Sequence, residues 1–198
     1  MFNKDKDMSK PKLIIVEGPD CCGKSTLAKA IARSLNATYW HITNTPLLAP
    51  ATVDYMTNGL ANAKANLNLG RHVVFDRFWP SEVCYGPVLR PDTNAVENGS
   101  ILQELTRHLD PIYIFCKDVD GVGTAIARHN KNKNADHPYR DEVYGQIYLN
   151  YLQLRVMLGD NVQVMSYYFD QNRFDEGKRT VCENQLNAIL TTFHLYLS

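Results

Sequence analysis

The sequence predicts an α/β domain in which helices cover both faces of a mainly parallel, five-stranded sheet. Two observations predict this three-layer α/β/α architecture. Five short runs rich in β-branched or aromatic residues alternate with longer segments of helical periodicity. Such alternation gives βαβ units, whose crossovers make the strands parallel and cover both faces of the sheet. A glycine-rich loop directly follows the first strand, where sheets of this kind bind ligands.

The first half of the chain supplies three of the strands. The apolar run KLIIVE predicts a buried strand over residues 12–17, and the helix that follows the loop has apolar residues every fourth position. Residues 38–42 and the run HVVFD at 72–76 predict two more strands. Residues 53–69 are predicted to form a helix that ends before Gly70, because glycine commonly ends helices.

The second half supplies the remaining elements. Helices are expected over residues 101–109, 119–128, 141–158 and 176–197, and strands over residues 111–116 and 162–167. The helix at 141–158 carries an apolar stripe that includes Tyr144, Tyr148 and Tyr151. Residues 130–140 are polar and basic without apolar periodicity, so a mobile loop is expected there.

Length and composition predict one domain over residues 1–198, with a flexible tail at residues 1–11. The 21 basic and 21 acidic residues cancel, which argues against binding to nucleic acid or membrane by bulk charge. No apolar run approaches the ~20 residues of a membrane span, and the first residues do not have the pattern of a secretory signal. The five cysteines fit neither a disulfide framework nor a zinc site, so we expect reduced thiols in a cytoplasmic protein.

The loop after the first strand predicts a nucleoside triphosphate site. It matches G-x-x-x-x-G-K-[ST], in which the backbone curls around phosphates at the start of a helix. Lys24 can reach the β- and γ-phosphates, and the Ser25 hydroxyl can ligate Mg²⁺. The residues expected to bind ATP are Gly18, Asp20, Cys21, Cys22, Gly23, Lys24, Ser25 and Thr26. The start of a helix is also expected to lower the pKa of the Cys21 or Cys22 thiol, so that oxidation could inhibit.

A second signature follows the strand at 72–76. Asp76 ends that strand, and a carboxylate there can hold Mg²⁺ or orient an acceptor. Arg77 offers a forked donor that suits a phosphate monoester.

These segments resemble the thymidylate kinases, a family of nucleoside monophosphate kinases with the P-loop kinase fold. VEGPDCCGKST resembles their E-G-x-D-x-x-G-K-[ST] loop, and VVFDRFWPSEVCYG resembles their D-R-[YFHW]-x-x-S-x-x-x-Y segment. Asp118-Val119, followed by Arg128, resembles the strand end that leads into their lid. The resemblance spans residues 12 to about 167 and implies transfer of a phosphoryl group from ATP, with Mg²⁺, to a thymidylate-like deoxynucleoside monophosphate.

The resemblance also implies roles for single residues. Asp20 would face the deoxyribose 3′-hydroxyl of the acceptor, and Arg77 would hold its phosphate. Asp76 would lie beside the metal, so that Ser25 and Asp76 are the metal candidates. Phe78 and Tyr85 flank Arg77 in the acceptor segment and are expected to contact the acceptor.

Residues 129–140 are expected to form a lid over the triphosphate. Arg128, Arg140 and several Lys and His residues cluster there in an otherwise neutral protein, and this charge can stabilise the transferring phosphoryl group. The resemblance implies that Arg128 and Arg140 bracket the lid and act in catalysis, since the phosphate loop contains no arginine. Closing the lid would also exclude water.

The sequence departs from the family where the base is read. Glu82 stands where a small polar residue is common, and Gly86 where glutamine is common, so the base does not follow from the resemblance. A kinase of a nucleoside hydroxyl, with Asp20, Glu17 or Asp76 as base, is the first alternative. A kinase of a hydroxymethylated base in DNA and a non-catalytic nucleotide switch are further alternatives. Related kinases often form homodimers, and the sequence leaves this open.

Overall fold

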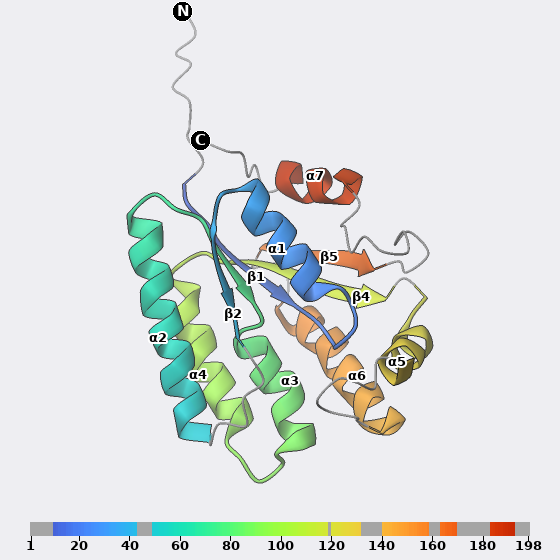
Figure 1. Cartoon of the computed structure of the whole chain (residues 1–198). Helices are drawn as coiled ribbons and strands as arrows, with labels where there is room; N and C mark the ends of the chain where they lie inside the picture. The colour runs from blue at the N-terminus through green and yellow to red at the C-terminus, as the bar shows by residue number, and fades with distance from the viewer. Residues whose placement is uncertain are drawn as a thin grey trace, which may run out of the picture.

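A computed structural model describes residues 10–42, 49–118, 120–131, 140–158, 163–169 and 183–192 (Figure 1). Five strands form one sheet: β1 (Leu13–Glu17), β2 (Thr38–His41), β3 (Val73–Asp76), β4 (Ile112–Asp118) and β5 (Gln163–Phe169). The described helices are α1 (Lys24–Ser34), α2 (Ala49–Asn68), α3 (Trp79–Leu89), α4 (Ala95–Arg107), α5 (Val122–Lys131), α6 (Asp141–Leu158) and α7 (Glu183–Thr192). None of these helices combines the length and apolarity that a bilayer crossing requires.

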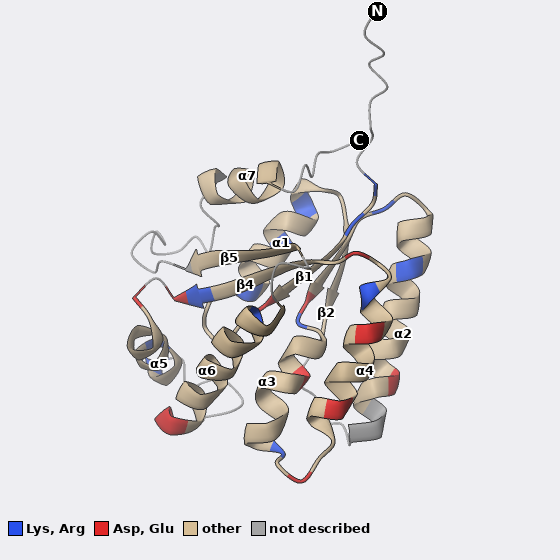
Figure 2. Cartoon of the chain, turned by 180° about the vertical axis from the view of Figure 1, so that it is seen from behind, with Lys and Arg blue, Asp and Glu red and all other residues tan. Residues whose placement is uncertain are grey.

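The sheet is parallel throughout and has the strand order β2-β3-β1-β4-β5. Alternate residues of each strand face opposite layers, because side chains in a strand have a period of two. Leu13 and Ile15 pack mainly against α2, α3, α4 and α6, whereas Ile14 and Val16 pack mainly against α1, α5 and α7. The predicted α/β fold with helices on both faces is therefore confirmed (Figures 1 and 2).

The strand order places the phosphate loop at the centre of the carboxyl edge. From the central strand β1 the chain first forms β2 and β3 on one side of β1, and later forms β4 and β5 on the other side. Parallel sheets bind ligands at this kind of switch point, beyond the carboxyl ends of the strands. The loop after β1 and the residues after β3 both lie there.

Helix α3 is not predicted by the sequence. Its residues are buried around most of its circumference, since α3 packs against both α4 and α6. It therefore lacks the polar face whose periodicity would reveal a helix. It also contains Pro80 in its first turn and Gly86 and Pro87 near its end, which are signals of a turn in sequence.

Other boundaries differ from those expected. Helix α4 begins at Ala95 and β4 extends to Asp118, so both are longer at one end than predicted. Residues 129–131 belong to α5, so the expected lid does not begin at residue 129. Residues 1–9 of the expected tail and 132–139 of the expected lid lie outside the described residues.

Candidate active site

The phosphate loop connects the buried end of β1 to α1, and its backbone conformation explains two of its glycines. Gly18 has φ of 140°, and a side chain there would collide with the carbonyl oxygen of Cys116 in β4. Gly23 has φ of 76° and caps α1, where its carbonyl accepts the Leu27 N–H at 3.0 Å. Both positions favour glycine, because other residues rarely adopt these angles.

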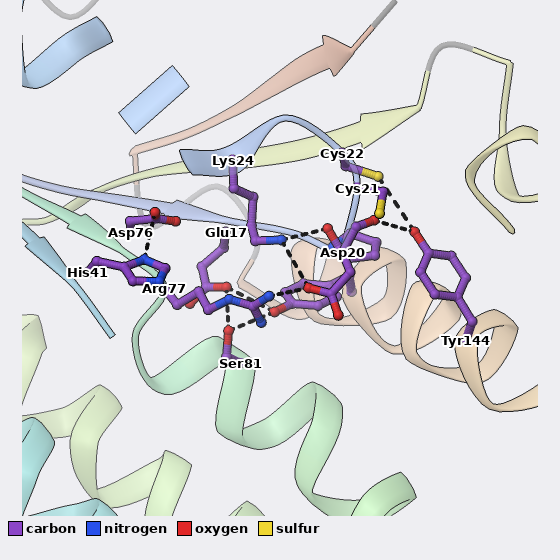
Figure 3. Close-up of polar contacts among 12 residues, drawn as sticks. Glu17, Asp20, Cys21, Cys22, Lys24, His41, Asp76, Arg77, Ser81 and Tyr144 are labelled. Carbon is purple, nitrogen blue, oxygen red and sulfur yellow. Dashed lines mark hydrogen bonds and ion pairs between the residues drawn. The ribbon is translucent and has the colours of Figure 1, made fainter. Parts of the chain in front are cut away.

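Lys24 lies in the first turn of α1 and points back across the loop. Its side chain is 5% exposed, and its Nζ donates to the Pro19 carbonyl at 2.6 Å and lies 3.7 Å from Asp20 Oδ1. Figure 3 shows the ammonium group directed toward the Asp20 side chain. A buried ammonium group at the start of a helix is suited to an anionic ligand.

Arg77 reaches the same carboxylate from the other side of the loop. Its Nη2 donates to Asp20 Oδ1, and its guanidinium lies over the Tyr85 ring with 5.2 Å between Cζ and the ring centroid. Arg77 is 8% exposed, and its Nη1 has no hydrogen-bond partner within the described part of the chain. Its backbone has φ of 73°, a strained conformation for a residue other than glycine and one of the kinds of strain that cluster at functional sites.

Asp20 is therefore shared by two buried cations. Burial alone would raise the pKa of the Asp20 carboxyl, but the charges of Arg77 and Lys24 and hydrogen bonds from Arg77 and Tyr85 lower it to about 2. The carboxylate lies between an ammonium group of α1 and a guanidinium after β3. The two sequence signatures thus meet at one point where negative charge is stabilised.

Asp76 is fully buried at the end of β3. Its Oδ2 accepts from the Tyr39 hydroxyl at 2.7 Å and lies 2.8 Å from His41 Nδ1. Burial alone would raise the pKa of Asp76, but hydrogen bonds from Ser25 and Tyr39 and the charge of Lys24 hold it below its usual value. The carboxylate is thus ionised at neutral pH.

The residues around Asp76 fit a magnesium ion. Asp76 Oδ1 is buried without a hydrogen-bond partner in the described ranges, and the Ser25 hydroxyl lies close to this carboxylate. Mg²⁺ is commonly held by one or two protein oxygens together with substrate phosphates, so a cluster of acidic residues is not required. Among the described residues no group of three or more His, Cys, Asp or Glu side chains could hold a metal alone.

His41 is a residue of the site that the sequence analysis did not identify. It ends β2, its side chain is 41% exposed, and it pairs with Asp76 (Figure 3). The available signal was its position at the carboxyl end of a predicted strand, the same rule that singled out Asp76.

Glu17 links the phosphate loop to α3 and α6. This fully buried residue ends β1, and its Oε1 accepts the Phe78 N–H at 2.5 Å. Its Oε2 accepts from the hydroxyl groups of Ser81 at 2.8 Å and Tyr151 at 2.9 Å. Burial raises the pKa of Glu17, although these hydrogen bonds and the charge of Arg77 oppose the shift. The sequence suggests Glu17 only as an alternative base, whereas its contacts in the structure are those of a positioning group.

Arg128 contacts the outer side of the phosphate loop. Its Nη1 donates to the Cys21 carbonyl at 2.9 Å, and its Nη2 lies 2.5 Å from Asp118 Oδ2. Arg128 thereby joins α5, the end of β4 and the loop. Arg140 lies exposed just before α6, where its carbonyl accepts the Tyr144 N–H at 3.0 Å.

The two cysteines of the loop differ from what the sequence suggested. Cys22 is fully buried, with its Sγ 3.9 Å from the Tyr144 hydroxyl, and burial raises the pKa of its thiol to about 11. The expected lowering by the helix start is therefore wrong for Cys22, because desolvation outweighs it. The cysteines at positions 21, 22, 84 and 116 are free thiols, as predicted, and Cys182 lies outside the described residues.

Phe78 and Tyr85 occupy different parts of the acceptor segment. Phe78 is fully buried against Phe75, with 4.9 Å between ring centroids, so it belongs to the core beneath the site. Tyr85 contacts Arg77 and lies near Asp20, so it borders the shared carboxylate.

Gly86 has a packing role. A Cβ at this position would overlap the Ala95 side chain, because α3 and α4 approach closely there. The glutamine that is common at this position in thymidylate kinases would not fit without moving α4.

Comparison with solved structures identifies proteins that share this fold. The chain resembles the YorR protein from Bacillus subtilis, solved in complex with phosphorylated GDP, with a TM-score of 0.63 and 16% identity over 93% of this chain and 96% of that one. It also resembles deoxyadenosine kinase from M. mycoides with bound dATP, with a TM-score of 0.59 and 16% identity over 92% of this chain and 99% of that one. The same kinase with bound dCTP gives a TM-score of 0.57.

The chain shares the fold of these proteins. At 16% identity, this similarity shows a shared fold and does not identify a substrate. No protein-family model matches the sequence, and no curated protein is detectably similar to it.

Proposed function

We propose that this chain is a kinase that transfers the γ-phosphoryl group of ATP to the phosphate of a deoxynucleoside monophosphate. The observation that carries the proposal is the Asp20 carboxylate shared by Lys24 and Arg77. One cation belongs to a triphosphate-binding loop and the other to a separate segment after β3. A phosphoryl group passing between two phosphates needs a cation on each side of its path.

The donor would bind along the loop from Gly18 to Thr26. Backbone N–H groups and Lys24 would hold the β- and γ-phosphates, and Arg128 would keep the loop in shape through the Cys21 carbonyl. Arg140, at the other end of the lid segment, would approach the triphosphate on closure. Mg²⁺, held by Ser25 and Asp76, would neutralise charge on the donor phosphates.

The acceptor would bind on the side of Arg77. Its phosphate would take a forked contact from the guanidinium, whose Nη1 has no partner elsewhere in the described chain. Asp20 would turn from Arg77 to the 3′-hydroxyl of the sugar. An acceptor phosphate is already ionised, so alignment and charge stabilisation suffice and no general base is required.

A nucleoside hydroxyl is the second candidate acceptor, and His41 is the observation that favours it. The pair of His41 and Asp76 has the arrangement in which a carboxylate orients an imidazole to accept a proton. The structural neighbours that are named deoxyadenosine kinase agree with this alternative. His41→Asn would abolish transfer to a hydroxyl and would leave transfer to a phosphate within a few fold.

The test is release of ADP from ATP and Mg²⁺ against four deoxynucleoside monophosphates, the matching deoxynucleosides and duplex DNA with hydroxymethylated bases. Turnover with a monophosphate supports the proposal. Turnover only with a nucleoside or only with the modified DNA overturns it in favour of that acceptor. ATP hydrolysis that no acceptor accelerates favours a nucleotide switch.

The charges on α2 and α4 bear on the DNA alternative. Both acidic and basic residues occur along these helices (Figure 2), which does not favour a broad surface for a long polyanion. We therefore rank modified DNA below both small acceptors.

A further inference from the structure

Strand β2 presents two side chains to the same carboxylate. Tyr39 and His41 are two residues apart, so they lie on one face of the strand, and Tyr39 packs with Val74 in the cluster beneath α1. The register of the two strands places His41 opposite Asp76. Asp76 Oδ2 contacts the Tyr39 hydroxyl at 2.7 Å and His41 Nδ1 at 2.8 Å. Two groups of β2 therefore hold one oxygen of this carboxylate, and Figure 3 shows the bond from His41.

Both groups donate a hydrogen bond to Asp76 Oδ2. An ionised carboxylate has no proton to give, so the hydrogen of the second contact is on His41 Nδ1. The Tyr39 hydroxyl keeps its proton, because burial, the hydrogen bond to Asp76 and the charge of Asp76 all raise the pKa of Tyr39. A carboxylate oxygen has two lone pairs. The two donors therefore use the capacity of Oδ2 to accept or to coordinate.

The other oxygen of Asp76 is available to a ligand. Asp76 is fully buried, and its Oδ1 has no hydrogen-bond partner within the described ranges. The Ser25 hydroxyl and the Lys24 ammonium group, both at the start of α1, are close enough to lower the pKa of Asp76 against the effect of burial. An unpaired oxygen of a buried carboxylate is costly in free energy unless a ligand completes it. Oδ1 is thus the oxygen that a metal ion at the phosphate loop would use.

A carboxylate that offers one oxygen suits Mg²⁺ better than Ca²⁺. Mg²⁺ requires nearly ideal octahedral geometry and is usually held by one or two carboxylates together with water and phosphate oxygens. Ca²⁺ accepts about six to eight oxygens in a flexible arrangement and often takes both oxygens of one carboxylate. Donors that occupy Oδ2 prevent this two-oxygen mode. Hydrogen bonds to the ligands of a metal commonly change its affinity roughly 10- to 100-fold.

We infer that Tyr39 and His41 select Mg²⁺ over Ca²⁺ as the ion that accompanies the nucleotide, because they restrict Asp76 to coordination through one oxygen. This inference rests on the proposed function, since it needs a metal ion between Asp76 and the phosphates of a nucleotide on the loop. Tyr39 is the main positioning residue, because its side chain is half-buried whereas that of His41 is 41% exposed. Without the Tyr39 hydroxyl the carboxylate could turn, and both of its oxygens could reach one ion.

The experiment measures how much each metal ion strengthens binding of an ATP analogue with an imido bridge between its β- and γ-phosphates. Calorimetry gives the Kd of the analogue in excess Mg²⁺, in excess Ca²⁺ and in EDTA. The ratio of the Kd in EDTA to the Kd with an ion is the gain that the protein obtains from that ion, and it needs no turnover. In the unchanged chain the gain from Mg²⁺ should exceed the gain from Ca²⁺ about tenfold or more.

Tyr39→Phe removes the hydroxyl and keeps the ring. The gain from Mg²⁺ should fall about tenfold while the gain from Ca²⁺ stays or rises, and the Kd in EDTA should stay within about twofold. Tyr55→Phe is the matched control, because it also removes a phenolic hydroxyl bonded to β2, at Trp40 Nε1, and it should leave both gains unchanged. Thermal unfolding checks each fold. His41→Ala, at the exposed end of β2, is the second variant and should lower the preference about threefold or more.

The outcomes separate this inference from the proposed function. A preference for Mg²⁺ that is lost in Tyr39→Phe, in a chain that turns over no monophosphate, supports the role of β2 and overturns the proposed acceptor. Turnover of a monophosphate by a chain with equal gains from the two ions overturns the role of β2 and leaves the proposed function standing. A preference that survives in folded Tyr39→Phe, or an equal fall of both gains, also overturns the selection by β2. Failure of the analogue to bind under all three conditions overturns both proposals.

Discussion

The two sides of Asp20 satisfy their buried polar atoms in different ways. On the side proposed to bind the donor, Lys24 donates to the Pro19 carbonyl, and Arg128 pairs with Asp118 and the Cys21 carbonyl. These side chains hold the phosphate loop in shape through contacts within the protein. The shape of the donor side is therefore fixed by contacts within the protein, before any nucleotide binds.

On the side proposed to bind the acceptor, Arg77 Nη1 is buried without an internal partner in the described part of the molecule, although Asp20 accepts from Arg77 Nη2. Asp76 Oδ1, between the two sides, is likewise buried without a partner in the described ranges, although Tyr39 donates to Asp76 Oδ2. We therefore expect the acceptor side to select the substrate, because a ligand bound there would complete the hydrogen bonding of Arg77.

Lys24→Ala should have the largest effect, since it removes the cation of the donor side. We expect kcat to fall roughly 100- to 1,000-fold, as for the loss of one preorganised charge-stabilising group. The melting temperature should change little, because Asp20 keeps its contact with Arg77. Steady-state kinetics and thermal unfolding measure both quantities.

Lys64→Ala removes an exposed charge from α2 and is the control for this change. A Lys24→Ala protein that is folded and fully active would contradict the assignment of the phosphate loop.

Arg77→Ala should affect the KM values of the two substrates differently. We expect the KM for the acceptor to rise about 10- to 100-fold, because a forked, charge-assisted contact is lost, while the KM for ATP changes less than about threefold. Arg77→Lys should recover only part of the loss, since an ammonium group lacks the fork. Arg71→Ala, at an exposed position before β3, is the control. Equal increases in both KM values would show that Arg77 is not specific to the acceptor.

The fold was predictable because its signals are local. Short apolar runs predicted the five strands, and the order of strands and helices predicted a parallel sheet. Helix α3 was not predicted, because packing on several sides removes the periodicity on which such a prediction depends. Its identity as a helix is decided by α4 and α6, which are distant in sequence.

The residues of the candidate site can likewise be separated into those that the sequence predicts and those that it does not. Lys24, Asp76 and Arg77 belong to contiguous motifs and could be singled out from the sequence. The contacts of Glu17 with Tyr151, 134 residues away, and of His41 with Asp76, 35 residues away, depend on the fold. No local pattern encodes such pairs.

Asp20 lies between the two sides, and its carboxylate should make the stability of the fold depend on pH. The charges of Arg77 and Lys24 overcome the effect of burial and lower its folded pKa to about 2, from an ordinary value of 3.8. A lowered folded pKa stabilises the fold above the ordinary pKa, and this contribution is lost as the pH falls from about 4 through 2. The shift corresponds to about 2 kcal/mol.

Urea unfolding of the unchanged chain and Asp20→Asn between pH 2 and 6 measures this contribution. The difference in unfolding free energy should be largest near pH 6 and should shrink below pH 4. Asp92→Asn, in the exposed loop after α3, is the matched control. A difference that is constant with pH would mean that the two cations do not hold Asp20 in its ionised form.

Two tyrosines of α6 allow the finest comparison of the two sides. The Tyr144 hydroxyl donates to the Asp20 carbonyl in the phosphate loop at 2.5 Å, whereas the Tyr151 hydroxyl donates to Glu17, which holds the first residues of α3. Removing either hydroxyl should cost about 1 kcal/mol of stability, the usual size of one lost hydrogen bond. Stability therefore does not distinguish the variants, but kinetics should.

Tyr144→Phe should raise the KM for ATP by a few fold and leave the acceptor unaffected, because the change alters the donor loop. Tyr151→Phe should do the reverse, since it loosens the carboxylate that orients Phe78 and Ser81 next to Arg77. Each variant is the other's control, as both lose one phenolic hydroxyl from the same buried face of α6. If both variants raised the same KM, Asp20 would not divide a donor side from an acceptor side, and the two halves would act as one coupled network.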